Sequence, residues 1–205
     1  MTLEQYKDAR ARDADFALSE EEIGRLYSLA GGVARMLPGS TSEVVLDLKP
    51  GRYAFYTNVP GPYITRLLEV TAIPADQPAE PDAQHTISMS EFAFDGAPDT
   101  LPAGKTTVNV VNEGQQAHLM AVVSEETLTA DQVQQSLSGT PLPLVPSFRG
   151  SDGGIGELAP GDSGWVTLDL GPGVYVLTCH VLDVSGGGSG KGHSDLGMSH
   201  VLTVQ

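Results

Sequence analysis

The chain has 205 residues, of which 40% are hydrophobic, so it is long enough for one large domain or two small ones with a buried core. Its formal net charge of -15 excludes nucleic acid as an expected partner, because phosphate neutralisation needs clustered Lys and Arg and only 11 are present, scattered along the chain. A basic protein partner or simple solvation of the surface fits this charge better. We expect no membrane span, and the sequence as given shows no pattern of an export signal.

A repeated motif occurs once in the first part of the chain and once in the last. It reads LDLKPGRYAFYTNV from Leu46 and LDLGPGVYVLTCHV from Leu168. In each copy, apolar residues alternate at period two before a Pro-Gly pair, which predicts two strands joined in a hairpin. Capping boxes at residues 19–22 and 129–132 predict a short helix before each hairpin.

The repeat indicates two copies of one globular domain, separated by a linker. The segment IPADQPAEPD from Ile73 is rich in Pro and acidic residues, and we place a linker over residues 73–85. Residues 1–72 are expected to form a partial, degenerate copy that lacks its front half. Residues 86–205 are expected to form the complete copy.

The complete copy contains further strand-like patterns separated by Gly and Pro turns. They lie at residues 87–94, 106–111, 117–123 and 200–204. Many short strands in this arrangement predict an all-β fold, a Greek-key β-sandwich or barrel, preceded by the partial unit with its short helices.

Four residues of the complete copy carry side chains that bind soft or borderline metals: His118, Cys179, His193 and Met198. Cys179 is the only cysteine, which excludes an intramolecular disulfide and any site built from several thiolates. Two imidazoles, a thiolate and a thioether are the ligand set of a blue copper site, with the Met as a weak axial ligand. Each residue alone is better explained as an ordinary core or loop residue. Their order, with three of them at one hairpin end and His118 on a neighbouring strand, predicts one copper ion per chain.

The segments AHLMAVV, GVYVLTC and GHSDLGMSHVLTV resemble the cupredoxin family of plastocyanin- and azurin-like blue copper proteins, over residues 86–205. The resemblance implies a Greek-key sandwich, a mononuclear type 1 copper, and one-electron transfer between proteins outside the cytoplasm. His180, directly after Cys179, is similar to a ligand of the trinuclear cluster of multicopper oxidases. The His-X-His pairs that such a cluster requires are absent from the sequence, so we expect no enzyme and leave the role of His180 open.

Two features depart from the family pattern. The Gly-rich segment at residues 184–192 lengthens the loop between Cys179 and His193, and the entropy lost on ordering it is expected to lower copper affinity. Leu119 stands where many relatives have a polar residue that hydrogen-bonds near the Cys sulfur, which is expected to shift the reduction potential.

Three functions remain open at the level of sequence. The first is an electron carrier with a basic redox partner, in which electrons pass near an exposed edge of His193. The second is a copper carrier or buffer without a redox partner. The third is a metal-free structural or adhesion module that pairs with another chain through its incomplete N-terminal half. That half has Thr57 where the second copy has Cys179, so it is expected to hold no metal.

Overall fold

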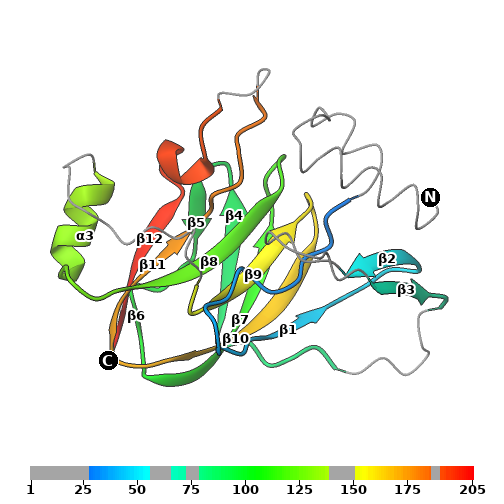
Figure 1. The fold of residues 1–205 in the computed structure, drawn as a ribbon, viewed down its shortest axis with the longest axis horizontal. Coiled ribbons are helices and arrows are strands. Elements are labelled where there is room, and N and C mark those ends of the chain that lie inside the picture. The colour runs from blue at the N-terminus through cyan, green and yellow to red at the C-terminus, as the bar shows by residue number, and fades with distance from the viewer. Residues whose placement is uncertain (1–27, 56–65, 73–78, 139–150, 186–189) are drawn as a thin grey trace. The chain divides into compact units, whose positions relative to one another are not determined.

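The structure is a computed structural model that describes residues 28–55, 66–72, 79–138, 151–185 and 190–205 (Figure 1). The chain divides into two compact units. One combines Leu29–Leu46 with Pro81–Gln205, and the other includes Asp47–Glu80. The segment Leu29–Leu46, which the repeat assigns to the first domain, therefore groups with the C-terminal part of the chain. That residues 1–72 form a partial, degenerate copy of the complete domain stays a prediction.

The larger unit is a sandwich of two five-stranded sheets. The first sheet has the strand order β1 (Glu43–Leu46), β10 (Ser163–Leu170), β7 (Gly104–Asn112), β4 (His85–Ser90) and β5 (Ala93–Asp95). The second has the order β6 (Thr100–Leu101), β12 (Ser199–Val204), β11 (Gly173–Thr178), β8 (His118–Glu125) and β9 (Gly153–Leu158). Neighbouring strands are antiparallel except for β4 with β7 and β12 with β6. The predicted all-β Greek-key sandwich is thus confirmed.

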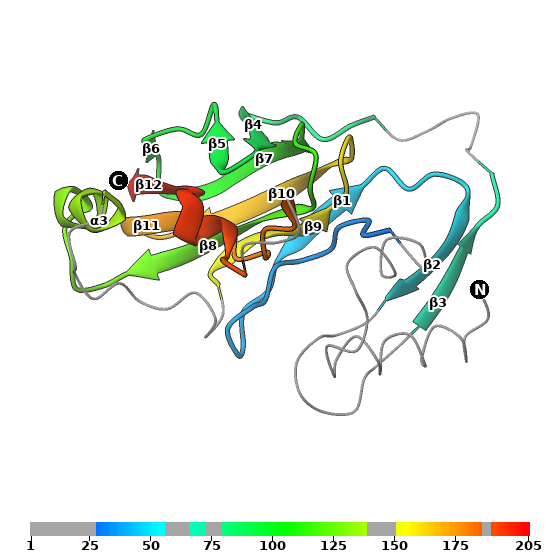
Figure 2. The same ribbon diagram turned by 90° about the horizontal axis from the view of Figure 1, so that it is seen from above.

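The two sheets enclose the hydrophobic core. Figure 2 shows β8, β11 and β12 in one layer and β4, β5 and β7 in the other. β7 alternates buried with half-buried residues, as expected for a strand with one face on a core, whereas β8 is buried along almost its whole length. Because β8 and β11 are neighbours in the same buried sheet, their ends are held in fixed positions.

The predicted hairpin is wrong in both copies of the motif. In the first copy, β1 pairs with β10, and β2 (Gly51–Phe55) pairs with β3 (Arg66–Val70). The two strands of the second copy are not paired with each other either. Both strands exist, but β10 pairs with β1 and β7, while β11 pairs with β12 and β8. The Pro-Gly turn therefore carries the chain from one sheet to the other. Alternation at period two identifies a strand and its buried face but does not determine its partner.

The N-terminal segment of the larger unit extends the edges of both sheets. Ala30 and Val33 form isolated bridges to Leu158 and Ile155 of β9, and β1 then pairs along β10. The pattern of the sequence did not predict β9, because GGIGEL has too many glycines to read as a strand. It is a strand because partners on both sides supply its backbone hydrogen bonds.

One α-helix is described in this unit, α3 (Ala130–Leu137). Thr129 accepts a hydrogen bond from the backbone of Gln132, whose side chain accepts one from the backbone of Thr129 in return, so the predicted capping box is confirmed. Val133 is buried on the inner side of the helix. Among the described residues, no helix is long and apolar enough to cross a membrane.

In the other unit the structure describes one antiparallel pair, β2 (Gly51–Phe55) with β3 (Arg66–Val70). The helix expected after residues 19–22 lies outside the described residues, as do Thr57 and residues 73–78 of the expected linker. The last residue of that linker, His85, is the first residue of β4.

Candidate metal centre

Three of the four predicted metal-binding residues meet at one end of the sandwich. His118 begins β8, Cys179 directly follows β11, and His193 begins the short 3-10 helix η3 (His193–Leu196). All three side chains are buried, and their candidate ligand atoms lie within 4.8 Å of one another. The Nδ1 atoms of the two histidines are 3.0 Å apart, and Cys179 Sγ is 3.5 Å from Nδ1 of His193. The predicted convergence of these side chains is therefore present in the fold.

Backbone hydrogen bonds hold Cys179 at the end of its strand. Its N–H donates to the carbonyl of Met198 at 3.3 Å, and its carbonyl accepts from the N–H of Ser194 at 2.7 Å. The N–H of Leu119 lies 3.5 Å from the Cys179 sulfur. A backbone donor thus stands where relatives were expected to use a polar side chain, so the apolar Leu119 does not leave the sulfur without a polar contact.

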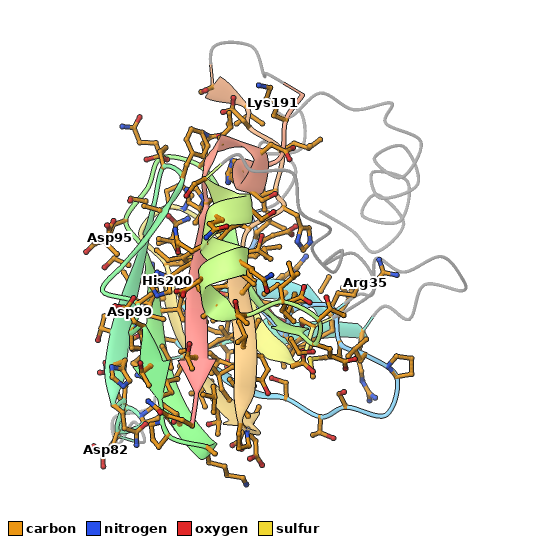
Figure 3. The ribbon with its side chains drawn as sticks, turned by 90° about the vertical axis from the view of Figure 1, so that its left-hand side faces the viewer. Arg35, Asp82, Asp95, Asp99, Lys191 and His200 are labelled. Carbon is orange, nitrogen blue, oxygen red and sulfur yellow. The ribbon has the colours of Figure 1, made fainter. Side chains whose placement is uncertain are left out.

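Backbone hydrogen bonds join the two ends of the long loop between Cys179 and His193. The N–H of His193 donates to the carbonyl of Val181 at 2.8 Å, and the N–H of Asp183 donates to that of Lys191 at 2.9 Å. Figure 3 shows Lys191 at the far end of the unit from Asp82. Residues 186–189 lie outside the described residues. The described ends of the loop are therefore tied together, so the glycines do not separate the thiol from the imidazole.

Met198 belongs to the same corner of the fold. It is fully buried, and its N–H donates to the carbonyl of His193 at 2.9 Å. Gly197 allows the chain to turn so that Met198 reaches the carbonyl of His193, because its φ of 110° lies in the left-handed region that favours glycine. That the thioether of Met198 is the axial ligand stays a prediction.

The protonation of these groups suits a metal ion. Burial lowers the pKa of His118 and of His193, and the neighbouring His118 lowers that of His193 further, so both rings are neutral at pH 7. Burial raises the pKa of the Cys179 thiol to about 11. Among the described residues, Nε2 of each histidine has no hydrogen-bond partner, while the two Nδ1 atoms lie 3.0 Å apart and the sulfur lies 3.5 Å from Nδ1 of His193. Two neutral nitrogens and one soft sulfur, all buried, fit copper in its Cu(I) and Cu(II) states.

Two residues that the sequence reasoning missed touch the imidazole rings. Glu91 Oε1 lies 3.6 Å from Nε2 of His118, and the ring of Phe92 meets that of His193 edge-on with centroids 5.1 Å apart. Desolvation acts to raise the pKa of the exposed Glu91, but its hydrogen bonds, above all those from the N–H groups of Gln115 and Gln116, outweigh it and lower that pKa. Nothing in the spacing of the sequence relates Glu91 or Phe92 to the histidines, because they come from the turn between β4 and β5.

The expected exposed edge of His193 is a wrong prediction. The side chain is fully buried, and among the described residues the half-buried Phe92 lies against it. His180 is exposed and does not belong to the cluster of His118, Cys179 and His193. His200 lies elsewhere, with Nε2 3.4 Å from Asp99 Oδ1, and Figure 3 labels both residues.

No protein-family model and no curated protein sequence matches this chain. Solved structures do match it. A dithionite-reduced auracyanin from the photosynthetic bacterium Roseiflexus castenholzii is 26% identical, with 60% of this chain and 99% of that chain covered at a TM-score of 0.41. Auracyanin A of Chloroflexus aurantiacus, described as a "blue" copper protein, is 23% identical over 58% of this chain and 99% of its own, with a TM-score of 0.34. A multicopper oxidase from Campylobacter jejuni is 12% identical over 86% of this chain and 52% of its own, with a TM-score of 0.36.

Because these TM-scores are low, the family resemblance rests on the strand topology and on the site itself. Two facing β-sheets arranged as a Greek-key sandwich carry a buried His-Cys-His cluster at one end. The order of these residues along the chain is the one that the resemblance implies. The predicted resemblance of this chain to the blue copper proteins of the cupredoxin family is therefore confirmed.

Proposed function

We propose that this chain is a copper-binding electron-transfer protein with one type 1 copper site. His118, Cys179 and His193 would supply the three strong ligands, and Met198 the weak axial one. The observation that carries the proposal is the approach of two buried Nδ1 atoms to 3.0 Å beside the only thiol of the chain. A copper ion bound there would supply one-electron oxidation and reduction.

The protein itself would hold the ligands in nearly the same positions in both oxidation states of the copper. Cys179 and Met198 are tied by a backbone hydrogen bond, as are Met198 and His193. All four side chains are fully buried, which excludes water from the site. A rigid, dry site changes little when one electron arrives, so the protein would add little to the reorganisation that accompanies transfer.

Burial favours an electron carrier over the alternative of a copper carrier or buffer. A protein that delivers metal needs a ligand that solvent or a partner can reach, whereas these ligand side chains have no solvent-accessible surface. A metal-free structural module gives no reason for two buried, neutral Nδ1 atoms to lie 3.0 Å apart beside a buried thiol, whereas a metal ion would receive all three donors.

The experiment that tests the proposal is titration of the metal-free protein with Cu(II). An intense blue band from thiolate-to-copper charge transfer is expected in the wild type and is lost in Cys179→Ser, with far-ultraviolet circular dichroism unchanged. A colourless wild-type product would refute the proposal. If the blue band forms, reversible reduction without loss of Cu(I) to a chelator supports electron transfer, and rapid loss of Cu(I) supports the copper carrier instead.

The setting of this function is part of the same proposal. The net charge of -15 suits a redox partner with a basic docking surface. The chain would work outside the cytoplasm, as the family resemblance implies, and would not itself be an enzyme.

A further inference from the structure

The turn between β4 and β5 brings two adjacent side chains to the two imidazole rings of the metal centre. Glu91 approaches His118, and Phe92 packs edge-on against His193 at an interplanar angle of 64°. Phe92 has a φ of 67°, which places it in the left-handed region that side-chain-bearing residues rarely adopt. Such a conformation persists only where its surroundings fix the backbone, so the position of the turn is determined by its contacts.

The carboxylate of Glu91 is held at a defined point. Its Oε1 accepts hydrogen bonds from the N–H of Gln115 at 2.5 Å and of Gln116 at 3.2 Å. The loop that carries these donors is fixed from the other side, because Asn112 Nδ2 donates to the carbonyl of Gln116 at 2.8 Å. Oε1 therefore faces His118 as part of a connected hydrogen-bond network rather than as a free surface side chain.

The ring nitrogens of His118 have different surroundings. Nδ1 faces Nδ1 of His193 at 3.0 Å, whereas Nε2 is buried, has no hydrogen-bond partner in the part of the chain that the structure describes, and lies 3.6 Å from Oε1 of Glu91. If the proton of His118 resides on Nε2, Nδ1 can accept from His193 in the metal-free protein and can bind a metal after loading. A carboxylate opposite the outer N–H of a metal-binding histidine fixes this tautomer and raises the basicity of the ring.

Gly114 makes this approach possible. A Cβ at position 114 would lie 2.7 Å from Nε2 of His118 and 2.8 Å from Oε1 of Glu91, so any side chain there would force the two groups apart. The absence of a side chain at this position is what lets the carboxylate come near the ring.

We propose that Glu91 is a positioning residue of the metal centre, which holds the proton of His118 on Nε2 and lowers the reduction potential of the bound metal. The proposal rests on the proposed copper site. The negative carboxylate stabilises the more positive, oxidised metal through the ring of His118, so the oxidised form is favoured.

Two readouts test this role, and Glu113→Gln is the matched control because Glu113 is an exposed carboxylate of the loop that follows β7. In the metal-free protein, nitrogen-15 NMR of the His118 ring is expected to show the Nε2-protonated tautomer in the wild type and in Glu113→Gln. Glu91→Gln is expected to give a mixture of tautomers. In the copper-loaded protein, Glu91→Gln is expected to raise the midpoint potential more than Glu113→Gln does.

Gly114→Ala is a second test, because it forces the carboxylate of Glu91 away from the ring of His118 but leaves Glu91 and Glu113 unchanged. Gly114→Ala is expected to raise the midpoint potential, as Glu91→Gln does. Equal potentials in Glu91→Gln and Glu113→Gln, or an unchanged tautomer in Glu91→Gln, would overturn the positioning role. A wild-type protein that forms no blue band would refute the copper site instead, and the NMR of the metal-free protein would still decide how Glu91 acts on His118.

Discussion

The Nδ1 atoms of His118 and His193 lie 3.0 Å apart, which is too close for two lone pairs to face each other without a proton or a cation between them. Because burial lowers the pKa of both rings, they are neutral at pH 7, and one must donate to the other when no metal is bound. A metal ion would take the place of that proton between the rings and receive both nitrogens, while the proton moves to Nε2 of the ring that donated it. The metal-free fold is thus already close to the geometry that a metal requires.

Removing either clustered histidine should abolish strong copper binding. His118→Ala and His193→Ala are each expected to lower copper affinity by more than about 100-fold, because a direct ligand contributes more than the groups that support it. His180→Ala is the control, since His180 is exposed and outside the cluster. Competition with a chelator of known affinity measures the effect, and equal losses in all three variants would argue against this ligand set.

Copper uptake should release a proton from Cys179. Burial raises the pKa of this thiol to about 11, so it is protonated at neutral pH and must ionise to bind metal. The pKa values of His118 and His193 are lowered instead, so at about pH 7.5 these rings have no ionisable proton to lose. Copper affinity should therefore rise with pH, by about tenfold per pH unit below the pKa of the thiol.

Calorimetry in buffers of different ionisation enthalpy counts the protons released in this reaction. We expect about one proton per copper ion in the wild type near pH 7.5 and none in Cys179→Ser. An affinity that does not change between about pH 7 and pH 9 would contradict thiolate ligation.

Changing Met198 should alter the potential and keep the colour. Met198→Leu preserves side-chain volume and is expected to retain the blue band but raise the midpoint potential, because the thioether stabilises Cu(II) from the axial side. Met89→Leu is the matched control, since Met89 is also fully buried. Voltammetry of the two variants distinguishes an axial ligand from a residue that only fills the core, and equal potentials would indicate the latter.

The attachment of β1 to the sandwich can be tested at Gly164. A Cβ there would lie 2.7 Å from Ile155 Cδ1, 2.8 Å from Leu46 Cδ2 and 3.1 Å from the carbonyl oxygen of Val45. Gly164→Ala is expected to lower the free energy of unfolding by about 1–3 kcal/mol through overpacking. Gly171→Ala, whose Cβ would meet nothing within 4 Å, should change it by less than about 0.5 kcal/mol. Urea denaturation measures both, and equal effects would show that Gly164 does not pack closely against Leu46 of β1 and Ile155 of β9 in solution.

The net charge should control how quickly the protein exchanges electrons. With a formal charge of -15, it should react faster with a small cationic oxidant than with an anionic one of similar potential. Added salt should slow the first reaction and accelerate the second, because it screens attraction and repulsion alike. Stopped-flow measurement at several ionic strengths tests this, and rates independent of salt would remove the argument for a basic partner.

Local chemistry in the sequence determined much of the fold and most of the candidate site. Alternation at period two identified β1 and β10, and strand-like patterns near Gly and Pro turns identified β7, β8, β11 and β12. The capping box at Thr129 identified α3. His118, Cys179 and His193 could be predicted together because their side chains are the donors that copper prefers and because Cys179 is the only thiol.

Only the tertiary structure decided which strands pair and what surrounds the ligands. Period two assigns a buried face but no partner, so neither the crossing from β10 to β11 nor the pairing of β1 with β10 could be predicted. Glu91 and Phe92 reach the imidazole rings, and His193 is fully buried, through contacts between segments distant along the chain. Such contacts depend on how the two sheets pack against each other, and this packing cannot be predicted from the spacing of residues along the chain.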